Sequence, residues 1–62
     1  MEEKRVFRWI DGENIHEYRF TNRICDGFFS NDKELYNYKG RELTKTWEEN
    51  LPIAGFKEIL KD

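Results

Sequence analysis

The amino-acid sequence predicts a mainly β or α+β fold: a small antiparallel sheet or barrel-like meander of four to five short strands with one short C-terminal helix. Turn-forming residues recur at fairly even spacing, and segments rich in aromatic and branched residues lie between them. Ten of the 23 hydrophobic residues are aromatic, and rings that bury roughly 150–250 Å² each can build a core in a short chain. The length predicts one small domain, residues 1–62, with residues 1–4 as a frayed N-terminus.

The first two strands are predicted from a hairpin signal. Val6–Ile10 is followed by the dipeptide Asp11-Gly12, which is typical of two-residue hairpin turns, and then by Ile15–Phe20. The second segment alternates between its two faces, as a half-buried strand requires. The residues expected together on one of those faces are His16, Tyr18 and Phe20.

A third strand and a second hairpin are predicted downstream. Ile24–Phe29 forms the third strand, in which Gly27 permits a bulge or a sharp bend. Leu35–Tyr38 and Arg41–Trp47 then pair across a turn at Gly40, because their tyrosines and threonines favour strands.

A helix is the alternative for the same stretch. Asn31 followed by Glu34 resembles a capping box. Leu43, Trp47 and Leu51 lie four residues apart, which would place them on one helical face. The hairpin is preferred because Gly40 interrupts the stretch.

The last eleven residues form the predicted C-terminal helix. Asn50 can cap it, and Pro52 would lie in the first turn, where its missing N–H is not needed. Gly55 inside this helix would cost up to about 1 kcal/mol relative to Ala. A helix this short is not stable alone in water, so its apolar face must dock on the sheet. That face would be made by Ile53, Phe56, Ile59 and Leu60.

Composition and charge exclude several classes of protein. The net charge of −2 and the pI of 5.4 disfavour a sequence-independent nucleic-acid binder, whose affinity depends on clustered basic residues. No apolar run approaches the roughly 20 residues that span a bilayer, and the N-terminus has no secretory signal. A single cysteine, Cys25, indicates a reducing compartment, so a cytoplasmic location is expected.

Candidate chemistry is sparse. His16 and Cys25 are the only residues of their types, and a nucleophilic pair has no local support. Two such ligands are too few for a structural zinc site. The neighbouring carboxylates Glu2-Glu3 and Glu48-Glu49 suit a solvated surface better than a catalytic cleft in so small a chain. The sequence therefore predicts a protein that is not an enzyme and has no cofactor and no metal.

The rings predicted to form the core are Tyr18, Phe20, Phe28, Trp47 and Phe56. The surplus of rings predicts a small protein-interaction module: an adaptor, inhibitor or accessory subunit that binds a larger protein through an exposed aromatic patch. Trp, Tyr and Arg are enriched among the residues that dominate interface energies. One alternative is a single-stranded nucleic-acid binder that uses the same rings with Arg8, Arg19, Lys39 and Arg41. Another is self-association, to a homodimer for example, through an open strand edge or the apolar face of Val6–Ile10. The predicted partner-binding residues are Phe7, Arg8, Trp9, Tyr36, Tyr38 and Arg41.

Overall fold

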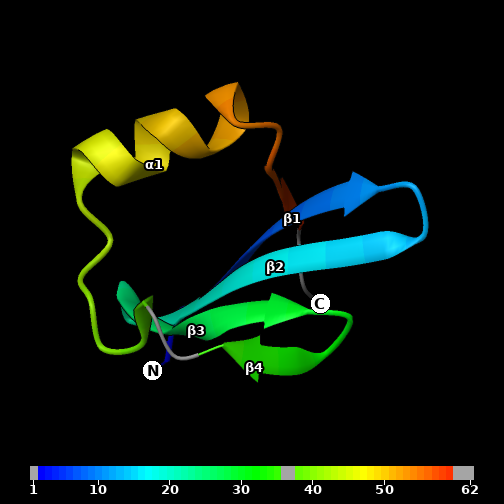
Figure 1. The fold of residues 1–62 in the computed structure, drawn as a ribbon. Coiled ribbons are helices and arrows are strands. Elements are labelled where there is room, and N and C mark those ends of the chain that lie inside the picture. The colour runs from blue at the N-terminus through cyan, green and yellow to red at the C-terminus, as the bar shows by residue number, and fades with distance from the viewer. Residues whose placement is uncertain (1, 36–37, 60–62) are drawn as a thin grey trace.

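The computed structural model describes residues 2–35 and 38–59, and in it the chain forms one five-stranded antiparallel sheet with a short helix on one side (Figure 1). The strand order is β4-β3-β2-β1-β5, so four consecutive strands form a meander and the last strand joins its free edge. This confirms the predicted fold class. The elements are β1 (Lys4–Asp11), β2 (Asn14–Thr21), β3 (Ile24–Ser30), β4 (Lys33–Leu35), α1 (Lys45–Ile53) and β5 (Lys57–Ile59).

The meander is built from three two-residue turns. At the first turn, Gly12 has φ +62°, and a glycine with positive φ in this position is typical of a type II′ turn. The other two turns, Asn22-Arg23 and Asn31-Asp32, have positive φ at both residues, as in type I′ turns. Asparagine tolerates this left-handed backbone better than most residues, which explains why the chain reverses at these positions.

Both turn asparagines also form hydrogen bonds with backbone outside their own hairpin. The N–H of Asn22 donates to the carbonyl of Glu3 at 2.8 Å, and its Oδ1 accepts the N–H of Glu3 at 3.0 Å. Asn31 makes the same pair of bonds with Ile15, at 2.8 and 2.9 Å. Each asparagine thus extends the sheet by one rung beyond its own hairpin. The first of these rungs, with the start of β1 at Lys4, lies within the segment predicted to fray.

A bulge in β3 confirms the expectation for Gly27. Arg19 pairs with Gly27, whereas the adjacent Phe20 pairs with Cys25, so that Asp26 is the extra residue. The Asp26 side chain accepts a 2.6 Å hydrogen bond from the Thr21 hydroxyl. The bulge returns Cys25 to the same face as Phe20, where both are buried.

The second hairpin predicted over Leu35–Tyr38 and Arg41–Trp47 is wrong, and the helical alternative holds for part of this stretch. Strand β4 ends at Leu35 and pairs with β3, Tyr36 lies outside the described residues, and only Glu42 makes an isolated bridge, to Ile24. Helix α1 begins after Thr44, whose hydroxyl accepts the N–H of Trp47 at 3.1 Å. An N-cap of this kind stabilises a helix by about 1 kcal/mol.

The predicted C-terminal helix is also wrong, because α1 ends at Ile53 and the chain continues into β5. The N–H of Phe56 donates to the carbonyl of Leu51, and the N–H of Gly55 to that of Pro52, which together form a Schellman C-cap. This motif requires a left-handed residue, and Gly55 supplies it with φ +104°. Gly55 therefore terminates a helix instead of lying inside one.

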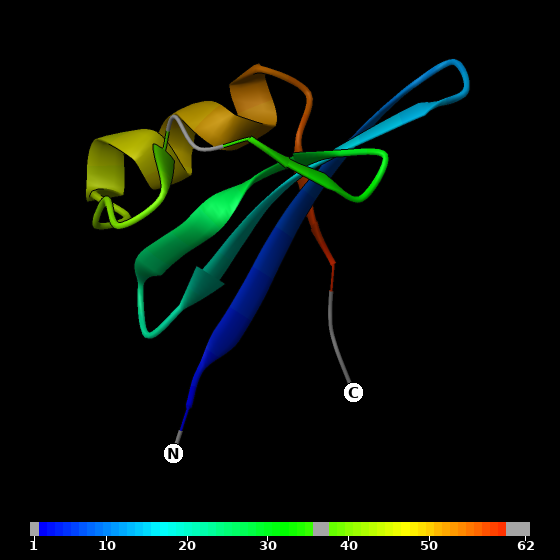
Figure 2. The same cartoon turned by 60° about the horizontal axis from the view of Figure 1, so that its bottom comes forward.

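Helix α1 covers one side of the twisted sheet (Figure 2); we call this the helix side and the opposite side the outer face. Leu51 is the buried residue of α1, and it packs in the same cluster as Leu43 from the preceding loop. Of the rings predicted to form the core, Phe20 and Phe56 are buried, while Tyr18, Phe28 and Trp47 pack against the core and remain half-buried. The core consists of Phe7, Phe20, Cys25, Leu43, Leu51 and Phe56.

Arg5 links three elements. From β1 it donates two hydrogen bonds to the carboxylate of Glu58 in β5, at 2.8 and 2.9 Å, and a third to Glu48 in α1 at 2.9 Å. Hydrogen bonds from Arg5 lower the pKa of both carboxyl groups, and those bonds in turn raise the pKa of Arg5. The second carboxylate oxygen of Glu48 approaches Arg23 at 3.5 Å. These ion pairs fix the helix and the last strand to the edge of the meander.

Candidate functional site

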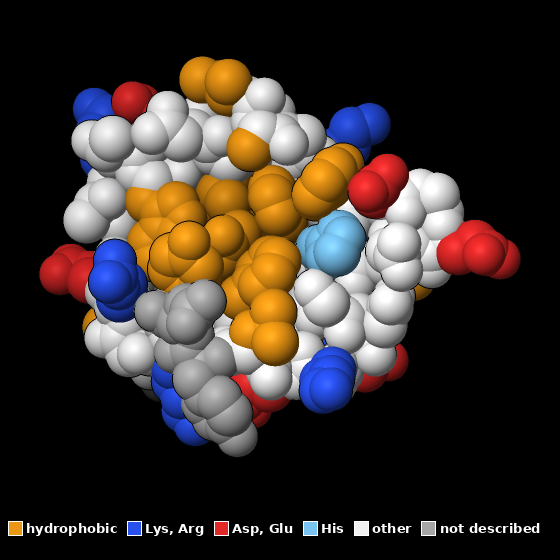
Figure 3. Space-filling model, viewed as in Figure 1, with side chains coloured by type: hydrophobic (Ala, Val, Ile, Leu, Met, Phe, Trp, Pro, Cys, Tyr) orange, Lys and Arg blue, Asp and Glu red, His pale blue; other side chains and the backbone are white. Residues whose placement is uncertain are grey.

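Five partly exposed rings form a continuous surface on the helix side. Figure 3 shows this side as a broad hydrophobic area between the helix and the sheet. Trp9 is 38% exposed, and the other four rings are half-buried. We call this set the aromatic surface; it comprises Trp9, Tyr18, Phe28, Tyr38 and Trp47.

Tyr18 is the centre of the aromatic surface. Its ring centroid lies 4.6 Å from that of Phe28, 5.3 Å from that of Tyr38 and 5.5 Å from that of Trp47. Burial and the nearby Tyr38 raise the pKa of its hydroxyl to about 12, so the group stays protonated at neutral pH. Rings packed in these edge-on and tilted arrangements stabilise one another beyond simple burial. Tyr18 therefore has ring contacts with three other members of the aromatic surface while one side of it remains exposed to solvent.

Two hollows lie along α1, and Trp47 contributes to the lining of each. The first hollow, of about 360 Å³, lies toward the N-terminal end of α1 and is lined by Tyr38, Arg41, Glu42, Thr44 and Trp47. The second, of about 200 Å³, lies one to two turns further on and is lined by Tyr18, Trp47, Asn50, Leu51, Ala54 and Phe56. Trp47 therefore lines both hollows.

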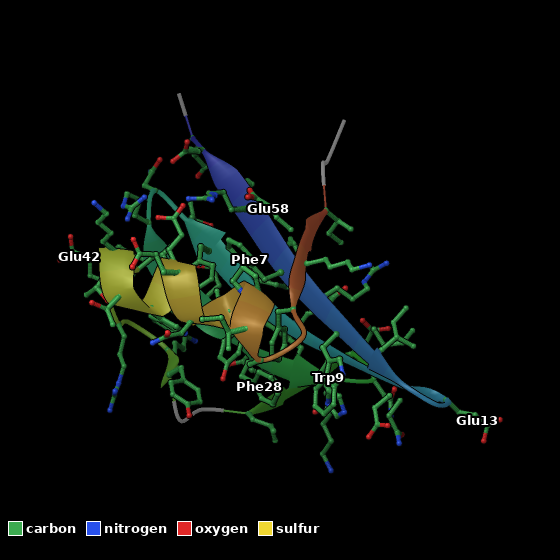
Figure 4. The ribbon with its side chains drawn as sticks, turned by 90° about the horizontal axis from the view of Figure 1, so that it is seen from above. Phe7, Trp9, Glu13, Phe28, Glu42 and Glu58 are labelled. Atoms are coloured by element: carbon green, nitrogen blue, oxygen red, sulfur yellow. The ribbon has the colours of Figure 1, made fainter. Side chains whose placement is uncertain are left out.

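Trp9 and His16 form the other end of this area. Trp9 lies beyond the C-terminal end of α1 (Figure 4), with its ring centroid 5.0 Å from that of His16 and 5.8 Å from that of Phe56. His16 Nδ1 lies 2.8 Å from the Ser30 hydroxyl, and the imidazole stacks parallel to Phe28 at 6.0 Å. The histidine thus has structural partners on three sides.

The outer face carries a charged network in place of rings. Glu17 is only 6% exposed, because Arg8 and Arg19 lie over it and donate hydrogen bonds of 2.7–2.9 Å. Burial alone would raise the pKa of Glu17, but the bonds from Arg19 and Arg8 lower it below its ordinary value. The guanidinium of Arg19 also stacks over the ring of Phe29 at 3.9 Å. Both arginines are therefore committed to contacts within the sheet.

The structure does not bring the predicted partner-binding residues onto one surface. Phe7 does not reach the surface, since it is 3% exposed and lies in the core with its ring edge against Phe20. Arg8 lies on the outer face, because side chains of adjacent strand residues point to opposite sides. Trp9 and Tyr38 belong to the aromatic surface. Arg41 is exposed, with its guanidinium 5.6 Å from the centre of the Tyr38 ring. Tyr36 lies outside the described residues.

Sequence reasoning assigned three rings of the aromatic surface to the core. Tyr18, Phe28 and Trp47 do pack on the core, but one side of each remains uncovered. The signal for Trp47 was its spacing from Leu43 and Leu51 on a helical face. For Tyr18 the alternation of β2 gave the correct face, and only the placement of α1 decides how much of that face is covered.

Cys25, the candidate nucleophile of the sequence, lies in the core. Burial raises the pKa of the Cys25 thiol, which is 1% exposed, so it is a poor nucleophile. Among residues 2–35 and 38–59 there is no group of three His, Cys, Asp or Glu residues that could hold a metal ion. Within the same residues no helix is long and apolar enough to cross a membrane.

Comparison of the chain with family models, with curated proteins and with solved structures finds no match.

Proposed function

We propose that this protein is a non-enzymatic interaction module that binds a larger protein through the aromatic surface. The observation that supports this is a group of partly exposed rings on one side of the sheet. Tyr18 contacts three of them, and Trp9 adjoins the group through His16 and Phe56. Isolated exposed apolar residues are ordinary, whereas contiguous apolar areas are typical of binding sites. Tyr and Trp dominate interface energies because they bury a large area at a small cost in side-chain entropy.

The distribution of the basic residues favours a protein partner over a single-stranded nucleic acid. Phosphate binding needs cations that are free to neutralise the backbone. Arg8 and Arg19 are paired with Glu17, and Lys39 lies 3.7 Å from Glu34. Of the four basic residues considered for that alternative, Arg41 is the one with no ion pair to a described residue.

The test is affinity capture from a lysate of the source cells, with the full chain as bait and proteins identified by mass spectrometry. Trp9→Ala removes the most exposed ring of the aromatic surface, and Ile15→Ala is the matched control on the outer face, where Ile15 is 41% exposed. We expect a partner that is retained by wild type and by the control and is lost with Trp9→Ala. Circular dichroism verifies that both variants fold.

Two further readouts separate the alternatives. Fluorescence titration with a mixture of single-stranded oligonucleotides at low salt would quench Trp9 or Trp47 if the rings stack on bases. Sedimentation of the purified chain over a range of concentrations measures self-association. Retention of the same partners by Trp9→Ala as by wild type would contradict the proposal, as would saturable quenching that is suppressed by salt.

A further inference from the structure

We propose that the edge of β1 next to β5 binds the C-terminal residue of another protein, which pairs with Ile10 as a short antiparallel strand and places its carboxylate beside Lys57. This goes beyond the proposed function, because neither Ile10 nor Lys57 belongs to the aromatic surface. Three observations support it: the direction of the Ile10 backbone groups, the hollow beside them and the charge of its lining.

The N–H and C=O groups of Ile10 point away from β2. Ile15 is the residue opposite Ile10, and both of its backbone groups bond to Asn31 instead, at 2.9 and 2.8 Å. Successive pairs of an antiparallel ladder alternate between hydrogen-bonded and non-hydrogen-bonded, so Ile10 and Ile15 form a non-hydrogen-bonded pair. The backbone groups of Ile10 therefore face the other edge of β1, along which β5 pairs.

Strand β5 does not reach Ile10. Its pairing with β1 stops at Arg8 and Lys57. Gly55 would come opposite Ile10 if β5 were longer, but its N–H donates to a carbonyl in the last turn of α1. Figure 4 shows β1 continuing past β5 toward the turn at Glu13. Among the described residues, the N–H and C=O of Ile10 therefore have no backbone partner.

A hollow of about 340 Å³ lies at this open edge. Its lining includes Trp9 from the helix side and Ile10 from the outer face, where the Ile10 side chain is 60% exposed. The full lining is Arg8, Trp9, Ile10, Gly55, Lys57 and Ile59. In strand addition, backbone hydrogen bonds to an open edge supply the affinity. A free donor and acceptor on one strand residue, beside a hollow, suit that mode of binding.

The start of β5 favours a chain terminus as the ligand. A strand that pairs antiparallel with β1 at Ile10 runs in the same direction as β5, so it meets Lys57 two residues further along β1. An internal segment would have to leave the sheet at that point. A C-terminal residue opposite Ile10 simply ends there.

The charge of the hollow favours a carboxylate. Its lining contains two basic residues, Arg8 and Lys57, and no acidic residue. Arg8 is paired with Glu17, whereas Lys57 is exposed and makes no ion pair with a described residue. One oxygen of a terminal carboxylate can accept the N–H of Ile10, and the other can contact Lys57. Hydrogen bonds to an ionised acceptor are stronger than those to a neutral carbonyl.

The test uses the full chain, labelled with ¹⁵N, and two acetylated peptides of the sequence Gly-Ser-Gly-Thr-Val-Thr. One peptide has a free C-terminal carboxylate, and the other has a C-terminal amide. The proposed contacts are with the peptide backbone and the carboxylate, so one sequence is sufficient. We expect the free acid to bind about fivefold more tightly, which is the effect of one exposed ion pair, and to shift the amide signals of Ile10 and Lys57.

A pair of variants tests the charge. Lys57→Gln should bind the two peptides with equal affinity. Lys33→Gln is the matched control, because Lys33 begins the edge strand at the other end of the sheet, and the two edge strands have nearly the same sequence. This control should retain the preference for the free acid.

Hydrogen exchange tests the backbone pairing in the wild-type protein. Without peptide, the amide of Ile10 should exchange faster than those of Trp9 and Asp11, which face β2. The free-acid peptide should slow exchange at Ile10. Sedimentation at the same protein concentration should show a monomer.

Equal affinity of wild type for the two peptides would overturn the proposal. The absence of binding by both would do the same, as would an Ile10 amide that is already protected in the free protein. If that protection accompanies dimerisation, the edge pairs with a second copy of this chain instead. Affinity capture with Trp9→Ala tests the aromatic surface, and the peptide assay measures Ile10 and Lys57, so either proposal can fail while the other stands.

Discussion

The turn asparagine Asn31 provides a sharp test of how the meander is held together. Its φ of +52° lies in the left-handed region, where a residue with a Cβ and no compensating side chain is less stable by about 1 kcal/mol. Its side chain accepts the N–H of Ile15 and donates to Asn14 at 3.1 Å. Both bonds are exposed to solvent, so together they contribute about 1 kcal/mol.

Asn31→Ala should therefore lower the free energy of unfolding by about 2 kcal/mol. That is a large share of the roughly 3–9 kcal/mol expected for a chain of this length. Asn31→Gly is the matched control, since glycine adopts positive φ freely and loses only the side-chain bonds. We expect a loss of about 1 kcal/mol for this variant.

Urea denaturation followed by tryptophan fluorescence measures both losses, because Trp9 and Trp47 lie in the ring cluster around Tyr18 and Phe56. The reasoning would be refuted if Asn31→Ala were as stable as wild type. A glycine variant less stable than the alanine variant would show that the backbone conformation is not the source of the effect.

Three further predictions follow from the ion pairs and the backbone. The pKa values of Glu17, Glu48 and Glu58 are lowered by their arginine partners, so their stabilisation is complete above the ordinary value of 4.5 and is lost as the pH falls through the lower folded-state values. The urea midpoint should accordingly fall in acid, and Arg5→Met should reduce this pH dependence, as denaturation at a series of pH values will determine. Gly55→Ala should destabilise the fold more than Gly40→Ala. Both glycines have positive φ, but a Cβ at Gly55 would lie 3.3 Å from Trp9 Cδ1, whereas a Cβ at Gly40 would meet nothing within 4 Å. Equal urea midpoints for the two variants would contradict this prediction. Thr44→Ala should lower the free energy of unfolding by about 1 kcal/mol through loss of the helix cap, with Thr46→Ala, inside α1, as the control in the same denaturation assay.

The first half of the fold could be predicted because its signals are local. The turn after Asp11, the alternation of Ile15–Phe20 and the bulge-forming Gly27 each depend on a few neighbouring residues. Hairpin register is fixed by turn type and by which face is buried, and both are visible in the sequence. The structure matches the sequence prediction from Val6 to Phe29.

The second half could not be predicted from local signals, because its elements are short and depend on tertiary contacts. Strand β5 has the sequence Lys57-Glu58-Ile59, in which Ile59 favours a strand but Lys57 and Glu58 do not, so pairing with β1 determines its conformation. Helix α1 has only nine residues and ends in a glycine-dependent cap. The sequence prediction places Gly55 inside a helix, where it would lower the stability of the helix. In the structure, the hydrogen bonds that end α1 make Gly55 the residue that terminates it.

The same difference between local signals and tertiary contacts explains how much of the candidate site could be predicted from the sequence. In β1 the alternation correctly places Phe7 and Trp9 on one face, but it does not say which of them the last strand and the helix will cover. The Schellman cap of α1 directs Phe56 into the core cluster, with its ring centroid 5.0 Å from that of Tyr18, whereas Trp9 is 38% exposed. The position of the helix end, more than the strand pattern, therefore decides which ring reaches solvent.

The rings of the aromatic surface carry two roles that can be separated by experiment. Tyr18 and Trp47 contact buried rings, so their removal costs stability whether or not the surface binds a partner. Trp9 is the most exposed of these rings, although its ring centroid also lies 5.8 Å from that of the buried Phe56. A loss of binding in Trp9→Ala that exceeds its loss in unfolding free energy would therefore indicate a surface that acts in recognition. If binding and stability instead decline in proportion across all ring variants, the exposed rings are the uncovered side of a small core.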